Sequence, residues 1–112
     1  MHIGIAIRRI RKELKIPQMK LALDCGLSQT SLSQIENGKK KPSQRTIDKV
    51  CEILTVPEML LYIAGMEEED IPESKRHIYR LLYPSIMSLT LQLISSEHNP
   101  KPAVGKSDSK GK

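Results

Sequence analysis

Apolar residues recur along most of the chain at spacings of three and four, which is the period of an α-helix that buries one face. The first stripe predicts a helix over residues 3–15, and Pro17 ends it because proline disfavours helical backbone in the residue before it. Similar stripes predict helices over residues 18–25, 29–36, 44–54 and 58–63. Their inner residues are Ile3, Ile7, Ile10 and Leu14; Leu21, Ala22 and Cys25; Leu32 and Ile35; Ile47, Val50, Cys51 and Leu54; and Met59, Leu60 and Ile63.

A tight turn joins the second of these helices to the third. Gly26 supplies the permissive backbone that ends a helix, Leu27 fills the corner beneath it, and Ser28 is a suitable N-cap. The outward face of the third helix then carries only amides and hydroxyls, namely Gln29, Thr30, Ser33 and Gln34. Such side chains suit hydrogen bonding to base edges in the DNA major groove, where glutamine pairs bidentately with adenine.

A polar and basic segment follows the third helix directly. Asn37-Gly38 predicts the turn out of the helix, and Lys39, Lys40 and Lys41 come next, at the height where phosphates would lie. Each of these features has a plainer interpretation, because a surface glutamine often has no partner and a lysine run is often a solvated loop. Their clustering around one short helix favours DNA contact.

Matches in register from Ile3 to about Ala64 resemble the helix-turn-helix family of the lambda repressor and Cro proteins, also called the xenobiotic-response-element family. The matching residues are Ile3-Gly4 with Ile7-Arg8, Arg11, Gln18, Leu21-Ala22, Gly26 to Gln29, Leu32 to Gly38, and Pro42-Ser43. The resemblance implies an all-α fold of five helices. Pro17 stands where many relatives have Ser or Thr, so a side-chain cap is lost there.

The resemblance also assigns roles to individual residues. It implies that Arg11 and Glu36 form a partly buried ion pair, although a solvated or phosphate-binding Arg11 is the alternative. It implies that Gln18 touches a phosphate and braces Gln29. The expected base contacts are Gln29, Thr30 and Gln34, and the expected backbone contacts are Gln18, Ser31, Ser33, Asn37, Lys39, Lys40 and Lys41.

Composition narrows the range of possible functions. The 112 residues include no Phe or Trp and only 3 Tyr, so the core must be aliphatic, which suits packed helices. The formal charge is +5, and the first 65 residues carry 11 Lys and Arg against 6 Asp and Glu.

The two cysteines read as buried thiols in a reducing cytoplasm, and the scattered histidines predict no metal site and no cofactor. No apolar run approaches the ~20 residues that span a membrane, and no catalytic constellation is visible.

Beyond the resemblance, an acidic run over residues 66–72 reads as a linker, and helical periodicity returns over residues 73–96. That segment predicts either one helix kinked at Pro84 or two shorter helices, and it carries two apolar stripes. The first stripe is Leu82, Ile86, Leu89 and Leu93; the second is Tyr83, Met87 and Ile94, joined by Leu91. We expect one stripe to pack on the domain and the other on a second subunit; the alternative is that both are internal. Residues 97–112, rich in Gly, Ser and Lys, predict a disordered tail.

The sequence therefore predicts an all-α protein with a five-helix DNA-binding domain over residues 1–65 and a C-terminal helical segment that forms a homodimer. We expect a cytoplasmic, non-enzymatic regulator of transcription, with a repressor favoured, that binds a pseudo-palindromic double-stranded operator. The alternative is an antitoxin or protein-interaction module, because antitoxins can share such a domain and add a segment like residues 73–96 that binds a partner protein.

Overall fold

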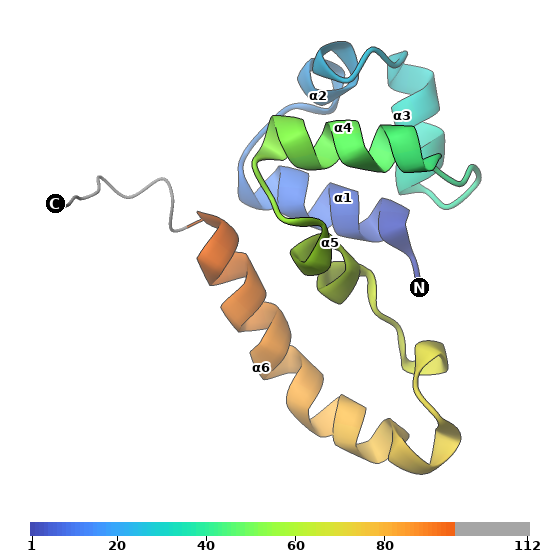
Figure 1. Cartoon of the computed structure of the whole chain (residues 1–112), viewed down its shortest axis with the longest axis vertical. Helices are drawn as coiled ribbons and strands as arrows, with labels where there is room; N and C mark the ends of the chain where they lie inside the picture. Colours follow the sequence, from blue (N-terminus) through green and yellow to red (C-terminus); the bar gives the residue numbers. More distant parts are fainter. Residues whose placement is uncertain (96–112) are drawn as a thin grey trace, which may run out of the picture.

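The computed structural model describes residues 1–95, and every regular element in that range is helical (Figure 1). The all-α class predicted from the sequence is confirmed. The expected tail over residues 97–112 lies outside the described part. The elements are α1 (Ile3–Glu13), α2 (Gln18–Asp24), α3 (Gln29–Glu36), α4 (Gln44–Leu54), α5 (Glu58–Gly65), the short 3-10 turns η1 (Glu68–Asp70) and η2 (Glu73–Lys75), and α6 (Arg76–Ser95).

The helices begin where the sequence provides local caps. Oγ of Ser28 accepts a hydrogen bond from the backbone N–H of Ser31 at 3.0 Å, and Oγ of Ser43 accepts one from Thr46 at 3.1 Å. Between α2 and α3, Gly26 adopts a left-handed backbone with φ of 73°, which a residue with a Cβ would occupy only with strain. These positions fix the turn that sets α3 against α2.

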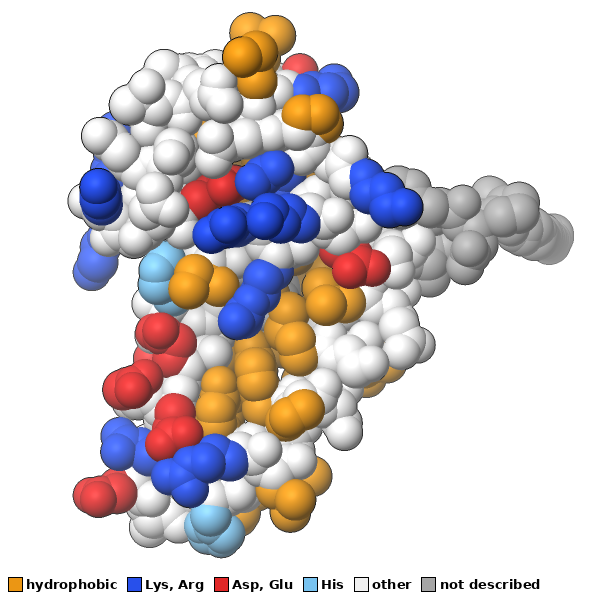
Figure 2. All heavy atoms as spheres, turned by 180° about the vertical axis from the view of Figure 1, so that it is seen from behind, with side chains coloured by type: hydrophobic (Ala, Val, Ile, Leu, Met, Phe, Trp, Pro, Cys, Tyr) orange, Lys and Arg blue, Asp and Glu red, His pale blue; other side chains and the backbone are white. Residues whose placement is uncertain are grey.

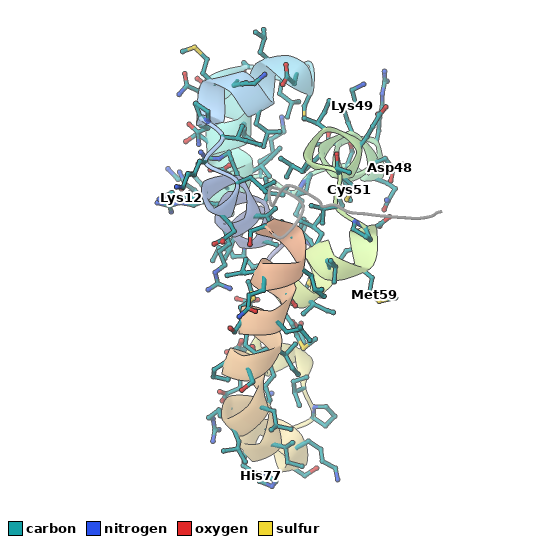
Figure 3. All side chains as sticks on the ribbon, turned by 90° about the vertical axis from the view of Figure 1, so that its left-hand side faces the viewer. Lys12, Asp48, Lys49, Cys51, Met59 and His77 are labelled. Carbon is teal, nitrogen blue, oxygen red and sulfur yellow. The ribbon has the colours of Figure 1, made fainter. Side chains whose placement is uncertain are left out.

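The aliphatic core gathers around α1, which α3 and α5 contact on different sides (Figure 1). Ile7, Ile10 and Leu21 are fully buried, as are Leu32, Val50 and Leu61 at relative exposures of 1% or less. The predicted inner face of α5 was partly wrong: Met59 is 71% exposed and points away from the body in Figure 3, whereas Leu61 and Ala64 are buried. The side of α5 that packs on α1 holds Leu61, Ala64 and Gly65, with Gly65 lying against His2 and Ala6, and Met59 lies outside it.

The start of α1 lies against the end of α3 with almost no space between their backbones. A Cβ added at Gly4 would stand 1.8 Å from the carbonyl oxygen of Ile35, which is far inside any allowed contact. Glycine at this position therefore lets α1 approach the end of α3, and that approach holds the exposed face of α3 outward.

The acidic run, which the sequence predicts to be a linker, contains a structured turn. Glu67 and Asp70 form a capping box around η1, and their carboxylates accept hydrogen bonds from the amino group of Met1 at 2.9 and 2.6 Å. Glu68 pairs with Arg80 of α6 through two hydrogen bonds of 2.9 and 3.0 Å. Arg80 thereby lowers the pKa of the Glu68 carboxyl. These contacts place the start of α6 relative to α1.

Residues 76–95 form one helix that continues through Pro84, rather than two shorter helices. Its inner side packs on the five-helix domain: Thr90 and Ile94 are buried, and the hydroxyl of Tyr83 donates to the carbonyl of Ile63 at 2.7 Å. Its other side is open, since Leu82, Ile86, Leu89 and Leu93 are 49, 44, 57 and 53% exposed. Figure 2 shows apolar side chains gathered over the half of the molecule that holds α5 and α6, bordered by charged side chains.

No helix within residues 1–95 combines the length and the hydropathy that crossing a lipid bilayer would need.

Candidate nucleic-acid interface

The third helix presents a polar face because its two apolar residues are turned into the core. Leu32 and Ile35 are buried, whereas Gln29, Thr30 and Gln34 are exposed and Ser31 and Ser33 are half-buried. The amide and hydroxyl groups of Gln29, Thr30 and Gln34 are therefore accessible to a ligand. One side of α3 is thus packed against the domain, and the other side is exposed to solvent.

Most of the residues expected to contact DNA lie together around one shallow surface hollow. The start of α2 contributes Gln18 to it, and the loop after α3 contributes Asn37 and Lys39. The full lining is Gln18, Gln29, Thr30, Ser33, Gln34, Asn37 and Lys39. The structure therefore groups all three expected base contacts with four of the seven expected backbone contacts.

The other three expected backbone contacts lie apart from that hollow. Nζ of Lys40 donates to Oγ of Ser31 at 3.3 Å, and this pair covers a neighbouring side of α3. Lys40 and Lys41 line a second hollow together with the start of α1. The lysine run thus divides: Lys39 lines the polar hollow of α3, whereas Lys40 and Lys41 line the hollow beside the start of α1, and Lys40 also bonds Ser31 of α3.

A buried ion pair fastens α3 to α1. Arg11 donates from Nε to Oε2 of Glu36 at 2.8 Å and from Nη2 to Oε1 at 3.0 Å, while Nη1 donates to the carbonyl of Ile16 at 2.9 Å. The side chains of Arg11 and Glu36 are only 10% and 2% exposed. This two-point contact fixes both position and direction, because the planar guanidinium matches the carboxylate.

Glu36 also reaches the exposed face through Gln18. Nε2 of Gln18 donates to Oε1 of Glu36 at 3.0 Å, and Nε2 of Gln29 donates to Oε1 of Gln18 at 3.3 Å. The first glutamine of α3 is therefore connected to the buried ion pair through the first residue of α2.

His2 also contributes to this region of the surface, although the sequence gave no indication of its role. Its Nδ1 accepts a hydrogen bond from the backbone of Ile5 at 2.9 Å and so caps α1. Its ring also packs beside Gly38, whose φ of 79° makes the turn out of α3, and lines the hollow that holds Lys40 and Lys41. A histidine before a helix gives little signal in a sequence, because Ser, Thr, Asp and Asn are the usual caps.

The two cysteines take no part in this face. Both are free and half-buried, and burial is the main cause that raises the pKa of each thiol. Within residues 1–95 no group of three or more His, Cys, Asp or Glu side chains is arranged to hold a metal ion.

Comparison with known proteins places these residues in context. A helix-turn-helix family model matches residues 7–61. Over 68 residues, the chain is 43% identical to the HTH-type transcriptional repressor RghR of Bacillus subtilis (strain 168), a match that covers 59% of this chain and 50% of that protein. It is 35% identical over 74 residues to the uncharacterized HTH-type transcriptional regulator RghRB of the same organism, covering 65% of this chain and 53% of that protein.

A third relative comes from a virus. The ImmF control region 10 kDa protein of Bacillus phage phi105 is 35% identical over 54 residues, which cover 48% of this chain and 60% of that protein. The chain thus spans only about half to three fifths of the length of the curated relatives it matches.

Proposed function

The chain belongs, through residues 7–61, to the Cro- and lambda-repressor-type helix-turn-helix family of transcriptional regulators, and from this premise we propose that it binds double-stranded DNA sequence-specifically and represses transcription. In this proposal α3 enters the major groove. Gln29, Thr30 and Gln34 contact base edges, and the surrounding lysines, serines, Gln18 and Asn37 bind phosphates.

The polar hollow on α3 is the observation that carries this proposal. Its lining combines Gln29, Thr30 and Gln34, whose side chains can hydrogen-bond base edges, with groups that can bind phosphates, and the buried residues of the same helix lie in the core. Phosphate contacts, which position the protein on DNA, and base contacts, which give sequence specificity, would thereby come from neighbouring residues, as DNA recognition requires. Repression is supported by the name of the Bacillus subtilis relative, which is a transcriptional repressor.

Homodimer formation is the second part of the proposal, and it rests on α6. The inner side of this helix packs on the domain while Leu82, Ile86 and Leu89 stay about half exposed along one side of it. Their spacing of four and three is that of a helix seam, so the same helix of a second copy is a self-complementary occupant. Two recognition helices would then lie roughly 34 Å apart and require a pseudo-palindromic operator.

The alternative is that a different protein binds the exposed side of α6. The exposed apolar residues continue towards the start of the helix, where Ile78, Leu82 and Ile86 line an apolar hollow with Met66 and Ile71. An antitoxin-like module would use this surface for a different chain, and its DNA-binding domain would be unchanged. Native purification that yields a stoichiometric second protein on α6 would favour this alternative over self-pairing.

Selection of bound fragments from the source's genomic DNA, sequenced after binding at about 0.15 M salt, tests the proposal. An inverted repeat with half-sites one helical turn apart supports both specific reading and the two-fold dimer. A single half-site or a direct repeat supports specific reading and contradicts the two-fold arrangement. Binding without sequence preference, lost as salt rises, contradicts the assignment of α3 as the recognition helix.

A further inference from the structure

The exposed side of α6 carries four aliphatic side chains whose spacing is the same when it is read from either end. Leu82, Ile86, Leu89 and Leu93 follow one another at intervals of four, three and four residues, and each is about half exposed. Side chains at such intervals form a seam along one side of a helix. Because the series is symmetrical about its midpoint, a second copy of α6 can match it in the parallel or in the antiparallel direction.

The apolar contacts alone do not distinguish these two directions. In a parallel pair, each of the four residues meets its own equivalent in the second copy. In an antiparallel pair, Leu82 meets Leu93 and Ile86 meets Leu89, so the same four side chains of each copy are again covered. The charged groups beside the seam therefore decide between the directions.

Basic side chains occur only at the N-terminal end of α6. Arg76, His77 and Arg80 lie in its first five positions, whereas residues 81–95 contain no Asp, Glu, Lys, Arg or His. Arg80 is paired with Glu68 at 2.9 Å, and Nε of Arg76 donates to two backbone carbonyls. The rest of the helix therefore offers a second copy an uncharged surface.

Lys75 lies directly before α6 and on the same side as the seam. It lines an apolar hollow together with Ile78, Leu82 and Ile86, and its ammonium group forms no ion pair within residues 1–95. A parallel pair would bring the two Lys75 side chains together at one end of the seam, beside the positively polarised N-termini of both helices. Like charges at short distance repel, so this direction is disfavoured.

An antiparallel pair avoids this repulsion and also fills the hollow. Each Lys75 then lies past Ser95 of the second copy, and the two Lys75 side chains stand at opposite ends of the pair. Leu89 and Leu93 of the second copy lie against Ile86 and Leu82, which line the hollow. The uncharged part of one helix thereby covers the apolar surface beside the basic end of the other.

We propose that α6 of a second copy of the chain occupies this face in the antiparallel direction, with its Leu93 against Leu82 and its Leu89 against Ile86. The two-fold axis of the dimer then crosses α6 at right angles, between residues 87 and 88. This inference rests on the homodimer of the proposed function, and it adds the direction of the pair, its register and the occupant of the hollow.

Cysteines placed at the two ends of the seam test the direction. Leu82→Cys and Leu93→Cys are made separately in a full-length chain whose native thiols are removed by Cys25→Ala and Cys51→Ala, and light scattering checks that each protein is a dimer. The antiparallel register separates the Leu82 positions of the two copies by about 16 Å, which is the length of helix from residue 82 to residue 93. A disulfide needs Cα atoms within about 7 Å of each other, so position 82 can be joined only to position 93.

We expect mild oxidation of an equimolar mixture of the two variants to give at least about fivefold more covalent dimer than either variant alone. A mixture of Leu82→Cys with Met59→Cys is the control, and it should give no covalent dimer because Met59 is exposed on α5. Efficient cross-linking of Leu82→Cys to itself would show a parallel pair, so the inference would be wrong while the proposed homodimer stands. A native chain that is monomeric in light scattering would contradict the homodimer and the inference together, and would leave the hollow to a different protein.

Contacts between methyl groups give a second readout that needs no substitution. In a dimer of one isotope-labelled and one unlabelled native chain, intermolecular nuclear Overhauser effects should join Leu82 with Leu93 and Ile86 with Leu89. Effects that join Leu82 only with Leu82 of the other copy would contradict the antiparallel direction, even if the cysteine variants do not dimerise. A dimer without intermolecular effects at any of the four residues would show that a different surface pairs, and would also overturn the inference.

Discussion

Gln34 projects from the exposed side of α3, one turn beyond Thr30, and lines the polar hollow with Gln29. We expect Gln34→Ala to relax base preference at one operator position at a cost of ~1–3 kcal/mol, because a bidentate amide contact is lost there. Binding to randomised operators, read by sequencing, checks this prediction. An unchanged preference at every position would remove Gln34 from the set of base contacts.

Lysines act differently, because their contacts with phosphates carry no sequence information. We expect Lys40→Ala to weaken binding to all sequences alike and to reduce the slope of log affinity against log salt by about one. Salt titrations of operator and non-operator DNA measure both effects. Lys75→Ala is the matched control, since Lys75 lies in η2 beside α6, and its slope should equal that of the native protein.

At the residue scale, the Arg11–Glu36 ion pair is expected to stabilise the folded protein. Arg11→Met leaves a carboxylate that is 2% exposed without its cation, and removal of one partner of a buried pair costs about 3–5 kcal/mol. Urea unfolding measures the loss. Lys20→Met, which breaks the exposed 3.1 Å pair with Asp24, should cost less than about 1 kcal/mol. Equal losses in the two variants would mean that the buried pair does not fasten α3 to α1.

At the scale of elements, the contact between α1 and the end of α3 depends on a glycine. Gly4→Ala would push its Cβ into the Ile35 carbonyl, which lies 1.8 Å from that position, so the two helices must separate. We expect a loss of more than about 3 kcal/mol, at the upper end of the cost of overpacking. Thermal and urea unfolding both report it.

Gly26→Ala provides the contrast for that prediction. A Cβ at Gly26 meets no atom within 4 Å, so only its φ of 73° opposes the substitution. The expected loss is about 1–2 kcal/mol, the cost of a left-handed backbone for a residue with a Cβ. A larger loss at Gly26 than at Gly4 would contradict the close approach of the two helices.

For the whole molecule, α6 decides whether one DNA-binding domain or two act together. Leu82→Glu combined with Ile86→Glu places two charges on the exposed side of α6, where the native side chains are 49% and 44% exposed. Light scattering should then report a monomer, and operator affinity should fall while a single half-site is bound as before. The core packing should be retained because neither residue is buried.

Met59→Glu is the matched control for that variant. Met59 is 71% exposed and points away from α6 in Figure 3, so the same change there should alter neither mass nor affinity. A native protein that is monomeric at high concentration would contradict the homodimer and leave α6 to a partner protein. In the same view, His77 lies at the N-terminal end of α6, well away from the five-helix domain.

The sequence by itself determined the helices and the polar face of α3. Helical period, the caps at Ser28 and Ser43, and the permissive backbone of Gly26 all act between near neighbours in the chain, so they can be recognised without a structure. The division of residues 29–36 into buried Leu32 and Ile35 and an exposed amide and hydroxyl face follows from the same periodicity.

Tertiary structure decided what depends on distant residues. Periodicity showed two stripes on α6, but only packing against α1 and α5 determined which stripe is covered; likewise the phase of α5 along α1 left Met59 exposed. The acidic run could not be distinguished from a spacer until folding brought Glu68 to Arg80, 12 positions away. The hydrogen bonds that join Arg11, Glu36, Gln18 and Gln29 depend on tertiary structure, because only the folded backbone brings α1, α2 and α3 within hydrogen-bond distance.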